Sequence, residues 1–391
     1  MIQYEKILNK VVSGIAPSGI RKFFDLAEQM ENVISLGVGE PDFITPWTIR
    51  EAGIYSLEKG RTHYTANSGM IELRKECSRY MKRKYGVTYD PADEILVTVG
   101  GSEAIDIMIR ALIEPGDEVL IPEPSFVCYK PCTAIAGGVP VIIQTKEEDN
   151  FKLTAQQVKE KITDKTKLLV LPFPNNPTGA VMDKEDLEAI AEVLRGTNIM
   201  VLSDEIYAEL QYSDKPHIPF SKIDGMWERT VVINGFSKAF AMTGWRLGYA
   251  MGPAPIISMM RKIHQFAIMS APTTSQYAAI EALRNCDKEV SDMCDEYNSR
   301  RRFVVDGFRK MGLSCFEPLG AFYAFPCIKS LNMTSDEFCD RLLKEERVAV
   351  VPGTAFGDCG EGFIRCSYAY SIEEISEALV RIERFVNKYR K

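Results

Sequence analysis

A lysine stands in a sequence setting that suits covalent chemistry. Lys238 belongs to the segment SKAFAMTGWRLGY, which comes shortly after the apolar run TVVIN. The carboxyl end of a buried parallel strand is where α/β proteins bind ligands. Phe240 and Met242 would partly shield the amine from water, which lowers the pKa of an ammonium group and favours Schiff-base formation. Taken alone, Lys238 could be a solvated loop residue, and its neighbours favour the reactive role.

Arg246 comes eight residues after Lys238. Its planar guanidinium could hold a phosphate through two parallel hydrogen bonds. We also expect Arg246 to open another strand of the sheet, which would bring it to the same region as the lysine.

An acid and a phenol follow a second apolar run, in the segment VLSDEIYAEL. An unpaired carboxylate at a buried strand end is costly, so a cation should face Asp204. A protonated pyridine nitrogen would serve, and Tyr207 could turn its hydroxyl toward the same ligand. The alternative is an aspartate that caps a helix, followed by an ordinary helical tyrosine.

Three further loops could reach the same edge of the sheet. Asn176 lies in PFPNNPTG after the run TKLLVL, and Phe126 of EPSFVCY could stack on an aromatic ring. Gly101, Ser102 and Glu103 begin a helix in VTVGGSEAI, where free main-chain N–H groups can bind phosphate. Each loop alone is equally typical of a turn, an ordinary strand-to-helix connection or a core aromatic residue.

Together these loops supply a lysine, an arginine, an acid, a phenol, an amide, an anion-binding turn and an aromatic ring. The set matches a ligand that carries a phosphate, an aromatic ring with a basic nitrogen, a phenolate and an aldehyde. Pyridoxal 5′-phosphate (PLP) has all of these groups, and we therefore predict it as the cofactor.

The surrounding sequence alternates short apolar runs with longer amphipathic stretches, which predicts an α/β fold. We expect a large domain with a mainly parallel seven-stranded sheet flanked by helices, because continuous apolar runs are typical of strands buried on both faces. The expected strands cover residues 94–99, 118–121, 139–144, 168–172, 199–203, 230–234 and 246–250. The expected helices cover residues 103–113, 183–194, 255–263, 275–285, 287–311 and 372–389.

A chain of 391 residues is long for one ordinary domain. We predict a large PLP-binding domain over residues 46–285 and a smaller α+β domain over residues 286–391. An N-terminal segment, residues 1–45, is expected to join the smaller domain, which is then built from both chain ends. We expect the run Arg300–Arg302 to form a solvated helix face.

Composition excludes several classes of function. The net charge of −7 argues against nucleic acid or an anionic membrane surface as a partner. The ten cysteines include no C-x-x-C pair and there are three histidines, so we predict no metal site. The sequence has no signal peptide and no apolar run of about 18 residues, which predicts a cytoplasmic protein without a membrane span.

Six motifs give the chain a family resemblance that covers essentially its whole length. They are SLGVGEPDF, THYTANSGMIELR, PFPNNPTG, SDEIY, SKAFAMTGWRLGY and GFIRCSYA. With them the sequence resembles the class I and II aminotransferases of PLP fold type I, in particular the microbial aspartate and aromatic amino acid aminotransferases.

The resemblance implies a role for each cofactor residue. Lys238 forms the Schiff base with PLP, and Asp204 pairs with the pyridinium nitrogen. Tyr207 and Asn176 contact the phenolic oxygen, and Phe126 stacks on the ring. The phosphate is held by Arg246 and by the helix start at Gly101, Ser102 and Glu103.

The resemblance also implies the substrate contacts and the assembly. Arg365 binds the substrate α-carboxylate, with help from the Gly39 main chain and from Asn176. Tyr64 reaches the phosphate of the neighbouring subunit in a homodimer. The implied activity moves the amino group of an L-amino acid, whether aromatic, aspartate or broad, to a 2-oxo acid such as 2-oxoglutarate by a ping-pong mechanism.

Three departures from the family pattern bear on phosphate binding and on substrate. Gly235 occupies a position where many relatives carry a phosphate-binding serine, which Ser237 would have to replace. Phe126 and Ser102 stand where aspartate-selective relatives often place tryptophan and lysine, which argues against strict aspartate selectivity. Two alternatives keep the cofactor residues: a PLP-dependent C–S lyase, and the PLP-binding domain of a transcription regulator.

Overall fold

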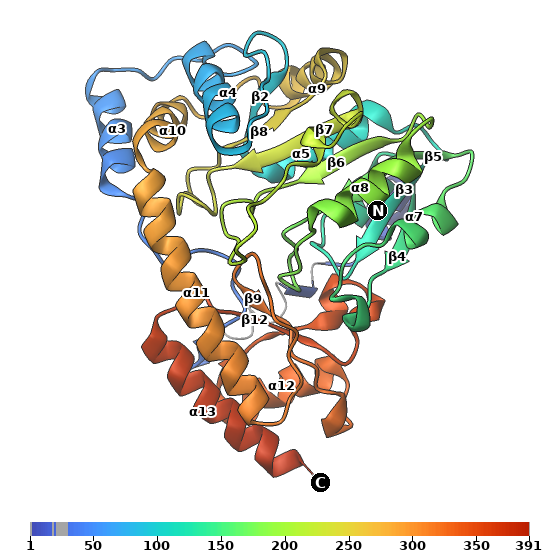
Figure 1. Cartoon of the computed structure of the whole chain (residues 1–391), viewed down its shortest axis with the longest axis vertical. Helices are drawn as coiled ribbons and strands as arrows, with labels where there is room; N and C mark the ends of the chain where they lie inside the picture. Colours follow the sequence, from blue (N-terminus) through green and yellow to red (C-terminus); the bar gives the residue numbers. More distant parts are fainter. Residues whose placement is uncertain (1, 18, 21–29, 391) are drawn as a thin grey trace.

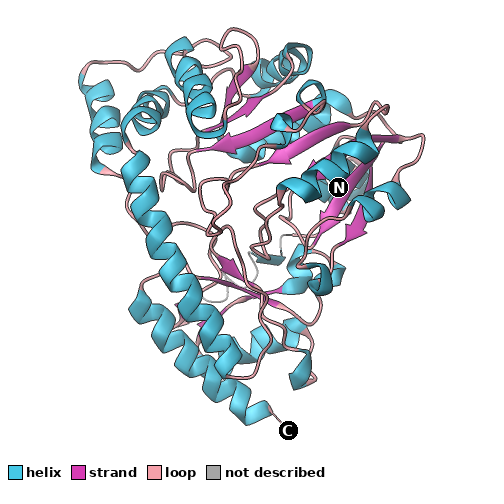
Figure 2. Ribbon diagram, in the orientation of Figure 1, coloured by secondary structure: helices cyan, strands magenta, loops and turns pink. Residues whose placement is uncertain are grey.

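A computed structural model describes residues 2–17, 19–20 and 30–390. A seven-stranded sheet with helices packed around it forms one part of the molecule, and the C-terminal helices gather beside it (Figure 1). Figure 2 shows the sheet strands as a fan of arrows between the helices. The sheet strands are β2 (Ile95–Thr98), β3 (Glu118–Glu123), β4 (Val139–Gln144), β5 (Thr166–Leu171), β6 (Met200–Asp204), β7 (Thr230–Gly235) and β8 (Gly248–Met251).

The strand order is β2-β8-β7-β6-β5-β3-β4. Strand β8 runs antiparallel to β2 and β7, and the other neighbouring pairs are parallel. The prediction of a mainly parallel seven-stranded sheet is therefore confirmed. The central strands are apolar and buried along almost their whole length, as expected for a sheet covered on both faces.

Helices surround the sheet and connect its strands. Those of the first part of the chain are α1 (Lys10–Ser13), α3 (Trp47–Glu58), α4 (Ile71–Tyr85), α5 (Gly100–Leu112), α6 (Tyr129–Ile135), α7 (Ala155–Lys161), α8 (Lys184–Leu194), α9 (Ala254–Ala267) and α10 (Thr273–Asn285). Helix α5 buries the apolar side chains Ala104, Ile105, Met108 and Ile109, which hold it against the sheet. That packing fixes the direction of the helix start that we predict as a phosphate site.

The smaller unit combines both ends of the chain. Its strands are β1 (Ile34–Ser35), β9 (Tyr323–Ala324), β10 (Val348–Ala349), β11 (Val351–Pro352) and β12 (Ile364–Ser367), and its helices are α11 (Asp287–Lys310), α12 (Ser335–Glu346) and α13 (Ile372–Tyr389). Strand β1 pairs in parallel with β10, so the N-terminal segment joins the C-terminal part as expected. Strands β11, β12 and β9 form an antiparallel sheet. The boundaries at residues 45 and 285 stay a prediction.

Strand β8 begins later than expected, because Arg246 precedes it with a left-handed backbone (φ +52). The expected strand over residues 246–250 is wrong at its start for this reason. Gly248 then lies against the start of α5, where an added Cβ atom would stand 2.6 Å from the Gly100 carbonyl carbon. The close approach of β8 and α5 therefore requires glycine here.

Helix α11 corrects our interpretation of the arginine run. Arg300 and Arg301 are buried, and Arg302 is the exposed member. Arg300 donates from Nη1 to both carboxylate oxygens of Asp42 at 2.9 and 2.8 Å, and Arg301 pairs with Glu317. Buried guanidinium groups persist when carboxylates pair with them, and Asp42 lies far from the run in sequence.

The part of the chain that the structure describes holds neither a membrane-spanning helix nor a cluster of metal-ligating side chains. None of its helices is both long and apolar enough to cross a membrane. Nowhere in the same residues do three or more His, Cys, Asp or Glu side chains gather as a metal site would require.

We expect Arg300→Ala to lower the free energy of unfolding by about 3 kcal/mol, because it leaves Asp42 without its cation in a partly buried site. Arg302→Ala is the matched control and should change stability by less than about 0.5 kcal/mol. Urea unfolding followed by tryptophan fluorescence measures both variants. Equal losses in the two would contradict the buried role of Arg300.

Candidate active site

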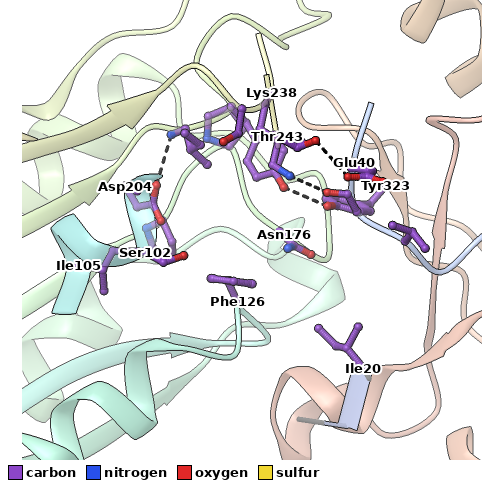
Figure 3. Close-up of a pocket in the computed structure, with 18 of the residues that line it drawn as sticks. Ile20, Glu40, Ser102, Ile105, Phe126, Asn176, Asp204, Lys238, Thr243 and Tyr323 are labelled. Atoms are coloured by element: carbon purple, nitrogen blue, oxygen red, sulfur yellow. Dashed lines mark hydrogen bonds between the residues drawn. The ribbon is translucent and has the colours of Figure 1, made fainter. Parts of the chain in front are cut away.

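A cavity of about 340 Å³ lies where the carboxyl ends of β6 and β7 face the smaller unit (Figure 3). Ten of the residues predicted from the sequence line it. They are Gly39, Gly101, Ser102, Phe126, Asn176, Asp204, Tyr207, Lys238, Arg246 and Arg365. The cavity therefore brings together side chains from both chain ends and from the sheet.

Lys238 follows β7 and enters the cavity from the sheet. Its Nζ atom donates a hydrogen bond of 2.5 Å to the Gly39 carbonyl oxygen. Burial, followed by the positive charge of Arg365, lowers the pKa of Lys238 to about 8. At pH 7 about a tenth of this amine is therefore unprotonated and nucleophilic, a far larger share than for an ordinary lysine.

Asp204 ends β6, where its carboxylate is buried at the base of the cavity. Tyr129 donates its hydroxyl to Oδ2 at 2.6 Å, and the Ile206 main-chain N–H donates to Oδ1 at 3.3 Å. Burial raises the pKa of Asp204 to about 6, and the hydrogen bond from Tyr129 opposes that rise. A cation placed against Asp204 would complete the site.

Tyr129 is a cavity residue that sequence reasoning missed. It stands three positions beyond Phe126, at the first residue of α6, and the two rings meet edge to face with their centroids 6.2 Å apart. Phe126 precedes the helix, so no helical spacing links the two residues, and a tyrosine at this position is typical of a core residue.

An anion site lies at the start of α5. Arg246 donates from Nη1 to the Thr243 carbonyl oxygen at 3.0 Å, and an added Cβ atom at Gly100 would lie 2.8 Å from Arg246 Nη2. Among the residues described, Arg246 forms no ion pair with a carboxylate. The guanidinium and the free N–H groups of Gly101 and Ser102 thus suit a phosphate.

Two predicted cofactor residues do not line the cavity. The Glu103 carboxylate binds His264 Nδ1 at 2.6 Å and accepts a hydrogen bond from the Val99 main chain, so any phosphate contact of Glu103 is limited to its main chain. Tyr64 is 81% exposed, and its predicted contact with a phosphate requires a partner subunit.

Arg365 is buried in β12 with its guanidinium facing the cavity. It donates from Nη1 to Asn176 Oδ1 at 2.9 Å and from Nη2 to the Gly37 carbonyl oxygen. Within the described chain, its Nε atom has no hydrogen-bond partner and no carboxylate pairs with the guanidinium. A substrate carboxylate would supply the missing charge and hydrogen bond.

Tyr207 and the missed residue Tyr323 meet beside Lys238. Their hydroxyl oxygens are 2.9 Å apart, and both side chains are buried. The aromatic-rich segment GAFYAFP was the sequence signal for Tyr323, and it is equally typical of a buried strand. Ile20, Glu40 and Ile105 also line the cavity.

The donor set fits PLP. A nucleophilic amine, a buried acid, a flat aromatic ring and an arginine at a helix start match its aldehyde, ring nitrogen, ring face and phosphate. The fit rests on Asp204 and Arg246 in particular, because Asp204 receives hydrogen bonds from neutral donors and Arg246 binds a carbonyl oxygen. Each is thus available to a ligand of opposite charge.

Comparison with known proteins agrees with this geometry. The family model "Aminotransferase class I and II" matches residues 31–382. The YugH protein of Bacillus subtilis strain 168 is 54% identical over 381 residues, covering 97% of this chain and 98% of that protein. An aspartate aminotransferase of Pyrococcus abyssi is 45% identical, covering 96% of this chain and 97% of that protein.

A solved structure also superimposes closely. The aromatic aminotransferase from Pyrococcus horikoshii OT3 has a TM-score of 0.90 and is 45% identical, covering 94% of this chain and 99% of that chain. With a family match over most of its length and a cavity that fits PLP, the chain belongs to the class I and II aminotransferases, which use PLP.

Proposed function

We propose that this protein is a PLP-dependent aminotransferase that prefers amino donors with aromatic or apolar side chains over aspartate. The observation that carries the proposal is one cavity that holds Lys238, Asp204 and an unpaired Arg365. The acceptor is a 2-oxo acid, and 2-oxoglutarate is to be tested beside pyruvate, because pyruvate carries a single carboxylate and 2-oxoglutarate carries two. The reported relatives are named aminotransferases, which favours amino transfer over C–S elimination.

Each residue has a role that follows from its position. When bound, PLP supplies an aldehyde and an electron-accepting ring for amino-group transfer. Lys238 provides the nucleophilic amine and moves the proton at the substrate Cα. Asp204 presents a negative charge to the ring nitrogen, and Arg365 orients the substrate through its carboxylate.

The other predicted residues hold the cofactor. Tyr207 and Asn176 direct polar groups toward the phenolic oxygen, and Phe126 covers one face of the ring. Arg246 and the N–H groups of Gly101 and Ser102 hold the phosphate.

The cavity lining supports the donor preference. Ile20, Ile105 and Phe126 are apolar, and Glu40 would repel a second carboxylate. Among the described lining residues, the cations are Lys238, Arg246 and Arg365. Each already serves the cofactor or the α-carboxylate, so this lining offers no further cation to the side chain of aspartate.

Class I and II aminotransferases are typically dimeric, and we propose that this one is a homodimer with Tyr64 reaching the neighbouring site. Exposed aromatic side chains support a partner surface, since Trp47 of α3 is 56% exposed and Phe266 of α9 is 87% exposed. Tyr64 itself is too exposed to serve the cavity of its own subunit.

The cytoplasmic location predicted from the sequence stays a prediction. It is supported by the ten cysteines, which are free thiols in the structure, as expected in a reducing compartment.

Lys238 tests the proposed chemistry directly. The wild type with PLP should show a visible absorbance band and transaminate, and Lys238→Ala should lose both. In the cofactor-free protein, the initial rate of Lys238 modification by trinitrobenzenesulfonate, a reagent whose own charge does not change in this range, should rise with pH around a midpoint near pH 8, because protonation blocks the amine below its pKa of about 8. Peptide mass spectrometry measures this midpoint. Full turnover by Lys238→Ala would falsify the assignment.

Donor preference is tested by following the absorbance change on adding each of the twenty amino acids. We expect phenylalanine and tyrosine to react faster than aspartate. Ser102→Lys should raise kcat/KM for aspartate about tenfold relative to phenylalanine, since it adds a cation at the start of α5. Ser102→Ala is the control and should leave the ratio near that of the wild type. A wild type that prefers aspartate would contradict the proposal.

The shared site is tested by mixing two variants. Lys238→Ala subunits lack the amine, and Tyr64→Ala subunits lack the phenol. In a mixed dimer, the site with Lys238 receives Tyr64 from its neighbour and should be active, so the mixture should exceed either parent after subunit exchange. If Tyr64 serves its own subunit, mixing brings no gain.

A further inference from the structure

Tyr323 contacts three parts of the cavity at once. Its ring lies beneath the Arg365 guanidinium, 4.4 Å from the guanidinium carbon to the ring centroid. Its hydroxyl is 2.9 Å from that of Tyr207, and the two rings meet edge to face. Gly39 packs on the same hydroxyl, where a Cβ atom would overlap it.

The segment from Gly37 to Gly39 joins the two cations of the substrate side. The Gly37 carbonyl oxygen accepts from Arg365, and the Gly39 carbonyl oxygen accepts from Lys238. Tyr323 presses on Gly39, so a shift of its side chain would move the acceptors of both cations.

The fold holds Tyr323 firmly in this place. It is 1% exposed and opens β9, where it pairs with Ser367 in β12, the strand that carries Arg365. Tyrosine and arginine therefore share a small sheet, which fixes the main chain of Tyr323 relative to β12. A cation over an aromatic ring is stabilised by the ring's negative face, and the effect is larger when water is excluded.

We propose that Tyr323 is a positioning residue that holds the Arg365 guanidinium ready for the substrate α-carboxylate through its ring, and orients Tyr207 through its hydroxyl. The inference rests on the proposed aminotransferase function. It separates two effects of one side chain, because the ring acts on substrate binding and the hydroxyl acts on the cofactor side of the cavity.

Two variants separate the ring from the hydroxyl. Tyr323→Leu removes the ring, and KM should rise about tenfold for both the amino acid and the 2-oxo acid, since both bind Arg365 through a carboxylate. Tyr323→Phe keeps the ring, so KM should stay within about twofold. It removes the hydrogen-bond partner of Tyr207 and should shift the pH midpoint of the bound cofactor's absorbance band.

Tyr368→Phe is the matched control. Tyr368 is also fully buried in the smaller unit, and its hydroxyl donates to the Ala321 carbonyl oxygen at 3.2 Å. It makes none of the three contacts of Tyr323, so neither KM nor the absorbance midpoint should change. Circular dichroism verifies that each variant is folded.

A measurement on the cofactor-free protein tests the role of Tyr323 independently of the proposed function. In crystals of the cofactor-free proteins, the hydrogen bond between Arg365 Nη1 and Asn176 should persist in Tyr323→Phe and Tyr368→Phe and be lost in Tyr323→Leu. This result stands even if the wild type does not transaminate. An undisplaced Arg365 with an unchanged KM in folded Tyr323→Leu overturns the role of the ring. An unshifted absorbance midpoint in Tyr323→Phe overturns the role of the hydroxyl. If Tyr323→Leu does not fold, the Tyr323→Phe measurement alone decides the proposal.

Discussion

The rest of the site depends on two cations that enter the cavity and have no carboxylate bonded to them among the residues that the structure describes. Lys238 donates to the Gly39 carbonyl oxygen, and Arg365 donates to the Gly37 carbonyl oxygen and to Asn176. Neutral acceptors orient these groups but leave their charge uncompensated. Burial, followed by the positive charge of Arg365, lowers the pKa of Lys238 and makes its amine reactive, whereas the Arg365 guanidinium stays charged and attracts a carboxylate. Burial raises the pKa of Asp204, and the hydrogen bond from Tyr129 opposes that rise.

The fold brings these charges together from distant parts of the chain. Strands β6 and β7 are parallel neighbours, with Asp204 opposite Ile233, so Asp204 and the segment that leads to Lys238 leave the sheet at one edge. Strand β12 brings Arg365, and the pairing of β1 with β10 places the Gly37–Gly39 segment beside it. These side chains come together only when both chain ends reach the carboxyl edge of the sheet. The smaller unit is therefore part of the site and not a separate domain beside it.

Residues that follow apolar strands could be predicted, because a strand end fixes where the next side chains lie. Lys238, Asp204 and Asn176 meet in one cavity on that basis. Tyr129 and Tyr323 could not be separated from ordinary core tyrosines, since their roles come from contacts with Asp204 and Arg365 that no local pattern reports. The arginine run misled for a related reason: a run of charge is typical of a solvated face, and Asp42, the partner of Arg300, lies 258 residues away in sequence.

The side chains that select the substrate differ from those that carry out the chemistry. Relatives at similar identity are named for aspartate and for aromatic substrates, so overall similarity does not decide the donor. The charges that line the cavity decide which amino donor is preferred. In the proposed roles, Arg365 binds the α-carboxylate and Arg246 binds the phosphate. A second substrate carboxylate would then face Glu40 without a cation of its own among the described lining residues. Because an uncompensated charge is costly in a partly dry site, electrostatics favours donors that carry a single carboxylate.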